Sequence, residues 1–325
     1  MNLDRRQFAA AGACAGLSAV GVGRIRNGLT PRDRRKPVSH VAVIEADNYE
    51  DALENYLFPF VQQLAPNVLG RSVLLKPNLV EDLPGPVNTH PALITAAARC
   101  FLSMGARQVI VGEGPGHQRD TEAILISTGL GPALESVGVQ FVDLNRDALS
   151  LIPLGSAFSG LNHLWLPQTV LAADVVVSMP KVKTHHWAGA TLSLKNLFGV
   201  IPGAKYGWPK NILHWRGIDR SVVDIAATVP IQLVIADGIV AMEGDGPLLG
   251  SPRKLNRIVI SDDPVAADAT CARLMGFHPS RIGYLTAAGD FLGNLDETRI
   301  KFQGSAPSWP REPFRVLPNF RYLML

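Results

Sequence analysis

The stretch DVVVSMPKVKTHHWAGATLSLKNLFGVIPG, residues 174–203, is the segment around which the rest of this 325-residue chain is arranged. It opens with three valines at residues 175–177, a β-branched run that is typical of a buried strand. Cationic side chains follow at once, interleaved with glycines and apolar residues: Lys181, Lys183, His185, His186 and Lys195. Because an unpaired buried charge is costly, a core segment does not carry so many. We interpret the stretch as a strand leading into an anion-binding or catalytic site; the alternative is a structural loop whose lysines reach water.

Outside this stretch, apolar strand, loop and helix alternate along the chain at least five times. The predicted strands cover residues 40–44, 72–75, 108–111, 139–142, 231–235 and 257–260. Such alternation predicts an α/β fold, in which a mostly parallel β-sheet carries helices on both faces. No repeat of fixed period is present.

Polar side chains follow the carboxyl ends of the predicted strands. In an open α/β sheet, ligands bind in the crevice outside these ends, so the side chains are expected to face one crevice. The predicted ligand-binding residues are Lys76, Asn78, Glu113, His117, Lys181 and Asn196. The predicted catalytic residues are Lys183, His185, Lys195 and His214. The lysines would bind or polarise an anion, and His185 or His214 would serve as general acid or base, because imidazole titrates near neutral pH.

Carboxylates after the later strands predict a divalent metal site of Asp237, Glu243 and Asp263, because hard cations bind oxygen ligands. The alternative for Asp263, which precedes Pro264, is a simple helix N-cap. The identity of any cofactor stays open at this point. An iron–sulfur cluster is not expected, because the chain has no C-x-x-C. Cys100 and Cys271 are expected to be buried thiols, with a disulfide between them as the alternative.

The N-terminal residues 1–36 differ in charge from the rest of the chain. They hold eight Arg and Lys against two Asp, a local charge of +6, so a total of +3 leaves −3 for the remainder. A mildly acidic body predicts no nucleic-acid binding. The twin arginines Arg5 and Arg6, then Phe8 and a short Ala/Gly-rich run, resemble a twin-arginine export signal. That run is too short for a stable membrane span. We therefore expect recognition by the twin-arginine translocase during export and a periplasmic or extracellular location.

These features predict three segments. The signal and its linker occupy residues 1–36, one α/β domain occupies residues 37–304, and a Pro-rich C-terminal tail occupies residues 305–325.

An ordered set of motifs over about residues 40–300 resembles the domain-of-unknown-function family 362. The set comprises KPN at residues 76–78, THP at 89–91, VGE at 111–113, KVKTH at 181–185, LKNLFG at 194–199, DGI at 237–239, EGDGP at 243–247 and DPVAAD at 263–268. The resemblance implies one site built from these motifs and supplies no substrate. Some members carry a ferredoxin-type module, whose cysteines this chain lacks.

The sequence therefore favours an exported enzyme that acts on a small anionic substrate at a Lys/His/carboxylate site, with a divalent metal as an option. Two alternatives stay open. One is a non-catalytic protein that binds an anion or a metal. The other is a redox accessory protein that uses an external cofactor.

Overall fold

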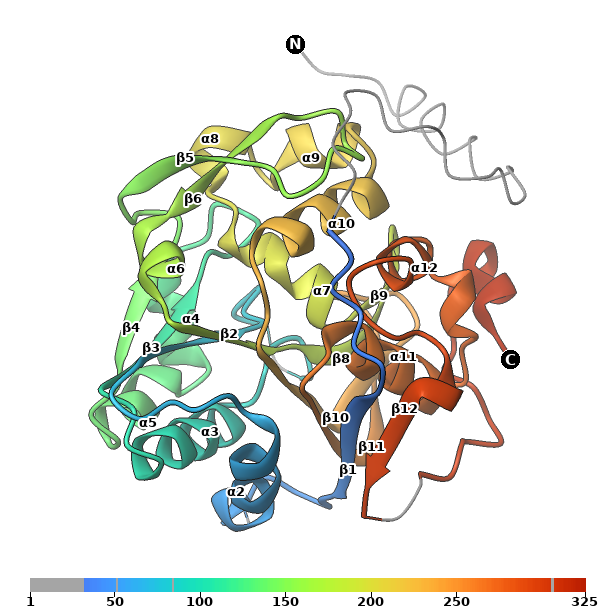
Figure 1. Cartoon of the computed structure of the whole chain (residues 1–325), viewed down its shortest axis with the longest axis horizontal. Helices are drawn as coiled ribbons and strands as arrows, with labels where there is room; N and C mark the ends of the chain where they lie inside the picture. The colour runs from blue at the N-terminus through green and yellow to red at the C-terminus, as the bar shows by residue number, and fades with distance from the viewer. Residues whose placement is uncertain (1–31, 51, 84, 305–306) are drawn as a thin grey trace.

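The computed structural model describes residues 32–50, 52–83, 85–304 and 307–325. The predicted export signal at Arg5 and Arg6 lies outside these residues. A ten-stranded sheet forms the centre of the described chain, in the order β12-β1-β11-β10-β7-β2-β3-β4, with β8 joined to β10 and β9 joined to β8 (Figure 1). The predicted class, α/β with a mostly parallel sheet, is confirmed.

The strands of this sheet are β1 (Ser39–Glu45), β2 (Ser72–Pro77), β3 (Gln108–Glu113), β4 (Gln140–Asp143), β7 (Val175–Met179), β8 (Lys181–His185), β9 (Gly189–Thr191), β10 (Leu233–Glu243), β11 (Ser251–Ser261) and β12 (Ile300–Gln303). A separate hairpin pairs β5 (Leu149–Pro153) with β6 (His163–Pro167). The helices are α2 (Leu53–Leu64), α3 (Pro91–Ser103), α4 (Thr121–Ser127), α5 (Leu130–Glu135), α6 (Gln168–Ala172), α7 (Ser193–Asn196), α8 (Gly203–Tyr206), α9 (Asn211–Trp215), α10 (Ile218–Thr228), α11 (Pro264–Leu274) and α12 (Gly283–Gly289). The described chain also contains the 3₁₀ turns η1 (Leu197–Val200), η2 (Pro279–Arg281), η3 (Glu297–Arg299) and η4 (Pro318–Leu323).

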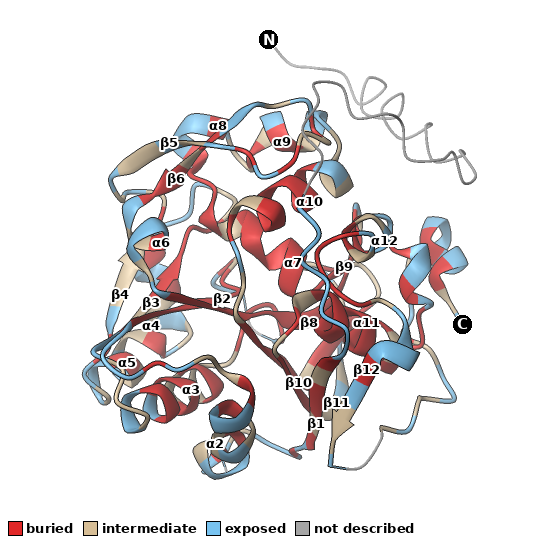
Figure 2. Cartoon of the chain, in the orientation of Figure 1, coloured by how far each residue is buried: buried red, intermediate tan, exposed pale blue. Residues whose placement is uncertain are grey.

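Two hydrophobic cores form because side chains along a strand alternate between the two faces of the sheet. Leu74 and Val176 pack with α7, α10 and α11 on one face. Leu75 and Val177 pack with α2 and α3 on the other face. The central strands are therefore buried on both sides, which explains their continuous apolar sequence (Figure 2).

One strand differs in direction from the sequence-based expectation. β11 is antiparallel to β10, with Val234 opposite Ser261 and Glu243 opposite Ser251. The sequence suggested two short strands far apart, but both extend well beyond the predicted ends and only residues 244–250 connect them. A parallel crossover needs a dozen or more residues, so this connection is too short for one. The carboxyl end of β11 therefore lies at the opposite edge of the sheet from the ends of the parallel strands.

The described part of the C-terminal tail packs against the body of the protein. Phe314, Phe320 and Leu323 are buried in the same core as α11 and α12. Leu325 also donates a backbone hydrogen bond to Gly276 O at 2.9 Å. Among the described helices, none is both long and apolar enough to cross a membrane.

Candidate functional site

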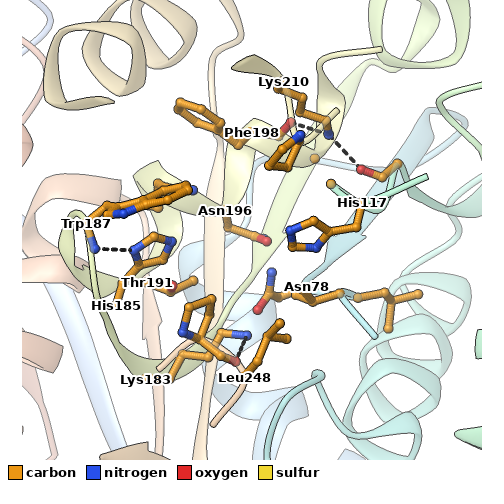
Figure 3. Close-up of a pocket in the computed structure, with 18 of the residues that line it drawn as sticks. Asn78, His117, Lys183, His185, Trp187, Thr191, Asn196, Phe198, Lys210 and Leu248 are labelled. Carbon is orange, nitrogen blue, oxygen red and sulfur yellow. Dashed lines mark hydrogen bonds between the residues drawn. The ribbon is translucent and has the colours of Figure 1, made fainter. Parts of the chain in front are cut away.

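A cavity of about 360 Å³ opens where β2, β3 and β8 end. Most of the predicted catalytic and ligand-binding side chains line it: Asn78, Glu113, His117, Lys183, His185, Lys195, Asn196 and His214. Figure 3 shows Asn78, His117 and Asn196 directed toward the same space. Lys210, which the sequence did not single out, also lines the cavity.

An ion pair between Lys76 and Glu113 forms the floor of the cavity. Their charged atoms are 2.6 Å apart, and both side chains are almost completely buried. Lys76 Nζ also donates to Pro77 O at 2.7 Å and to Asn196 Oδ1 at 3.1 Å, which uses all three of its donors. Lys76 therefore lies beneath the cavity, where it joins the ends of β2 and β3 to α7.

The backbone packs closely over this ion pair. A Cβ atom placed on Gly199 would overlap Glu113 Oε1 and Lys76 Nζ. Gly199 O in turn accepts a hydrogen bond from Gly114 N at 3.0 Å. Only glycine therefore fits at this point of the KNLFG segment, which explains why the glycine belongs to the motif.

Lys183, on β8, is fully buried and donates to two backbone carbonyls. Nζ lies 2.6 Å from Val87 O and 3.4 Å from Pro247 O. Burial, followed by the charges of Lys181 and Lys195, holds the pKa of Lys183 well below its usual range.

Lys195 lies on α7, whose start is held by a buried carboxylate. Asp268 accepts hydrogen bonds from the backbone N of Ser193 at 2.7 Å and of Leu194 at 3.0 Å. Lys195 Nζ lies 4.1 Å from the centroid of the Phe198 ring and has no hydrogen-bond partner within the described chain. Burial, and then the charge of Lys76, lowers the pKa of Lys195 to about 8.

Lys210 enters the cavity from a segment that the sequence predicted only as a lid or loop. Its backbone is left-handed, with φ of 67°. Nζ donates to Gly114 O at 2.7 Å and to Phe198 O at 2.8 Å, and burial lowers its pKa to about 7. No motif marked this lysine, because Gly114 lies 96 positions away along the chain and only the fold brings its carbonyl group to Lys210 Nζ.

The two predicted acid–base histidines have different tautomers. His185 Nδ1 accepts hydrogen bonds from the backbone N of Trp187 at 3.0 Å and of Ala188 at 3.3 Å, so its proton is on Nε2. His214 Nδ1 lies 3.2 Å from Lys210 O, which only accepts, so its Nε2 carries the lone pair. Burial and then the charge of Lys195 lower the pKa of both rings, to about 4 for His214. His185 is therefore a neutral donor and His214 a neutral acceptor.

Three buried polar atoms in the cavity lining lack a hydrogen-bond partner among the described residues. They are Asn78 Oδ1, His117 Nδ1 and Thr191 Oγ1. An unsatisfied buried polar atom costs about 1–3 kcal/mol, so such atoms are rare in a finished core. All three belong to residues that line this one cavity.

Lys181 and Asp237 lie outside the cavity lining, in a second buried ion pair. Lys181 Nζ is 2.7 Å from Asp237 Oδ2 and also donates to Tyr49 OH at 2.9 Å and Val240 O at 3.1 Å. Asp237 further accepts from Tyr49 OH at 2.6 Å and from His90 N at 2.9 Å. All of these contacts are internal, so the pair joins β8 and β10 to the start of α3.

The three predicted metal ligands are not brought together. Asp237 and Glu243 are six residues apart on β10, a separation of roughly 20 Å at the rise of a strand. Glu243 is paired with Arg315 at 2.7 Å. Asp263 follows β11 at the opposite edge of the sheet, where it caps α11 by accepting from Val265 N at 2.8 Å. The N-cap interpretation of Asp263 is confirmed.

Among the described residues, no group of three or more His, Cys, Asp or Glu side chains is placed to hold a metal ion. Cys100 and Cys271 are free and buried, which confirms the prediction of two structural thiols.

Comparison with known proteins identifies the family. Residues 73–273 match the model of the domain of unknown function DUF362. A thylakoid-associated protein of Synechocystis is 30% identical over 249 residues, which make up 73% of each chain.

Two solved structures are much more distant. A protein from Thermotoga maritima is 14% identical with a TM-score of 0.39, over 66% of this chain and 56% of the other. A lactate racemase apoprotein from Thermoanaerobacterium thermosaccharolyticum is 15% identical with a TM-score of 0.40, over 65% of this chain and 52% of the other. The match spans only about half of each solved chain, and neither indicates a reaction. The family match covers more than half of this chain and agrees with the motifs that line the cavity, and the chain therefore belongs to the DUF362 family.

Proposed function

We propose that this protein is an exported enzyme that binds a small anionic substrate in the cavity between β2, β3 and β8. The observation that supports it most is the charge of the lining. Lys183, Lys195 and Lys210 line the cavity, whereas Glu113 is the only carboxylate among the described residues of the lining and is already paired with Lys76. A bound anion supplies the missing negative charge.

A hydrated or hydroxyl-bearing anion in this cavity also satisfies the polar groups that lack partners. Asn78 Oδ1 accepts a hydrogen bond from the hydroxyl group or the water, whereas Thr191 Oγ1 donates one to the anion, and His117 Nδ1 does either according to its tautomer. His185 adds an N–H donor from Nε2. Phe198 and other apolar side chains of the lining lower the local polarity, which strengthens each electrostatic contact.

The two imidazoles supply the acid–base part of the proposal. His214 Nε2 carries a lone pair and accepts a proton from the bound substrate. His185 Nε2–H donates a hydrogen bond to an oxygen on which negative charge develops, as a neutral imidazole does in an electrophilic role. The sequence predicted that either ring could serve as general acid or base. The tautomers favour His214 as the proton acceptor and His185 as the hydrogen-bond donor.

Calorimetric titration of the purified protein with sulfate and glycolate tests the binding step. We expect binding of at least one anion, and its loss in Lys183→Met. A turnover screen with phosphate esters and hydroxy acids then tests catalysis. Binding without turnover favours the alternative, a non-catalytic anion-binding protein. Failure to bind any anion contradicts the proposal as a whole.

Location and metal content belong to the same proposal. The twin arginines Arg5 and Arg6 support export by the twin-arginine route.

Elemental analysis of the exported, folded protein tests whether a divalent metal accompanies the substrate. A stoichiometric metal in that protein would assign the acid–base chemistry partly to the metal ion.

A further inference from the structure

We propose that Lys195 is a catalytic nucleophile that forms an imine with the carbonyl group of an anionic aldehyde or ketone, such as a 2-oxo acid. The proposal rests on the anion-binding cavity described above and names the substrate class that the cavity accepts. It is supported by the contacts of Lys195, by its fixed position and by the two imidazoles beside it.

Lys195 differs from the other two lysines of the cavity in its contacts. Lys183 Nζ donates to Val87 O and Pro247 O, and Lys210 Nζ donates to Gly114 O and Phe198 O, so each of these ammonium groups has one donor left for a substrate. Lys195 Nζ makes no hydrogen bond to any described residue and contacts the Phe198 ring instead. An amine without carbonyl partners loses a proton at lower cost, and its lone pair is then open to the cavity.

The position of this amine is fixed by its own helix. Asp268 holds the start of α7, and the Asn196 side chain donates to Lys76 O at 2.9 Å and to Ser178 Oγ at 3.1 Å at its end. Desolvation and a neighbouring cation are the two features that activate a lysine nucleophile, and burial with Lys76 supplies both.

The imidazoles of His185 and His214 can supply the proton acceptor and the hydrogen-bond donor that imine formation requires. Lys195 Nζ lies 4.1 Å from the centroid of the Phe198 ring, and the His214 ring is 5.4 Å from that same ring, centroid to centroid. His185 lines the same cavity. His214 Nε2 can accept a proton from the amine, and His185 Nε2–H can polarise the carbonyl oxygen.

The step balances without a further reactant. The neutral Lys195 amine attacks the carbonyl carbon: a C–N bond forms, the carbonyl π bond breaks, and one of the two nitrogen protons passes by way of His214 to the oxygen, which gives a neutral carbinolamine. The remaining nitrogen proton then leaves with the hydroxyl group as water, the C–O bond breaks, and the C=N bond forms. No electrons are gained or lost. The ammonium groups of Lys183 and Lys210 bind the carboxylate of the substrate.

Reductive trapping tests this proposal. The purified full chain is incubated with glyoxylate or phenylpyruvate and sodium cyanoborohydride, and the product is followed by intact mass and peptide mapping. We expect one adduct, on Lys195. At neutral pH, labelling should be at least about tenfold faster than at the exposed Lys254, because an amine with a lowered pKa has a much larger neutral fraction.

Two variants and one competitor complete the experiment. Lys195→Arg keeps the positive charge but has no amine to form an imine, and it should lose the adduct. Lys254→Arg is the matched control and should keep it. Glycolate, which has the same charge as glyoxylate but no carbonyl, should bind and protect Lys195.

The outcomes separate the two proposals. Labelling that prefers Lys183, Lys210 or surface lysines overturns the role of Lys195. The absence of an adduct while glycolate still binds in calorimetry also overturns it, but leaves the anion-binding cavity intact. If neither glyoxylate nor glycolate binds, both proposals are wrong.

Discussion

Each buried lysine in this protein has a role that depends on its partner. Lys76 is paired with Glu113 and Lys181 with Asp237, both within 2.7 Å, and neither Nζ has a donor left for a ligand. Lys195 has no such partner. Removing one member of a buried ion pair leaves an uncompensated charge, whereas removing an isolated ammonium group does not. Binding and scaffold lysines are therefore separable by mutation.

Lys195→Met should abolish function and leave the fold intact. The variant should melt at the wild-type temperature or above it, because clustered like charges destabilise an empty site. Lys76→Met is the matched comparison: it leaves Glu113 buried without its partner, at a cost of about 3–5 kcal/mol. Thermal melts of both variants, with anion titrations, check this. A large drop in melting temperature for Lys195→Met would identify Lys195 as scaffold.

The affinity for an anion should fall as the pH rises through the pKa values of the cavity lysines. Those values are about 8 for Lys195 and about 7 for Lys210, and the anion prefers the ammonium forms. The decrease should approach about tenfold per pH unit for each proton released, between about pH 7 and about pH 9. Calorimetry with sulfate, which keeps its charge over this range, measures it. Lys254→Met should leave the profile unchanged, and a flat wild-type profile would refute the assignment.

At the scale of elements, the site depends on how closely η1 approaches the ends of β2 and β3. Gly199 places its backbone directly over the ion pair of Lys76 and Glu113. Lys210 then holds the segment around α9 against the same region, because its ammonium group joins Gly114 O to Phe198 O. Short segments from three parts of the chain thus close the cavity through a few polar contacts.

Gly199→Ala should destabilise the protein and weaken anion binding together. Its Cβ would overlap Glu113 Oε1 and Lys76 Nζ, so the floor must shift, at a cost of about 1–3 kcal/mol or more. Gly131→Ala on α5 is the control, because the nearest atom to its Cβ would be Leu125 Cβ at 3.7 Å. Urea unfolding and sulfate titration measure both effects. Equal stability of the two variants would show that the floor is not closely packed.

At the scale of the whole molecule, both ends of the described chain are attached to the body. Arg34, near the N-terminal end, donates to Ala227 O at 2.7 Å. Near the other end, Arg315 pairs with Glu243, and Phe314 lies in the core, where its ring meets Phe277 edge-on. The C-terminal tail therefore contributes to the stability of the domain.

Phe314→Ala should cost about 3–5 kcal/mol of stability, because it leaves a cavity where a large ring was buried. Tyr322→Ala is a matched change in the same tail. The side chain of Tyr322 is mostly exposed, so its removal should change the free energy of unfolding by less than about 0.5 kcal/mol. Urea unfolding compares the two variants, and a Phe314→Ala protein as stable as wild type would show that the tail does not support the fold.

Replacement of Arg5 and Arg6 by lysine should keep the protein in the cytoplasm, because the translocase reads the arginine pair itself. Cell fractionation and immunoblotting of the variant against wild type measure the distribution. Normal accumulation of the variant in the periplasm would contradict export by this route.

The sequence by itself determined the α/β class and indicated which polar side chains line one cavity. Apolar strand runs such as residues 175–177 are local signals, and polar residues that follow parallel strands must share one edge of the sheet. Lys183, His185 and Lys195 could therefore be assigned to one cavity from their positions alone. Their separation along the chain is short, so little tertiary information was needed.

Only the tertiary structure decided which partner each charged group has. Glu113 pairs with Lys76, and Lys210 reaches Gly114 O across 96 positions of the chain. Such pairings depend on contacts between distant segments, which composition and periodicity do not encode. The direction of β11 was likewise decided only by the tertiary structure. It follows from the length of β10 and β11, which leaves too short a connection for a parallel crossover. Because β11 is antiparallel, Asp263 lies at the opposite edge of the sheet, away from the metal site that the sequence predicted, and caps α11 instead.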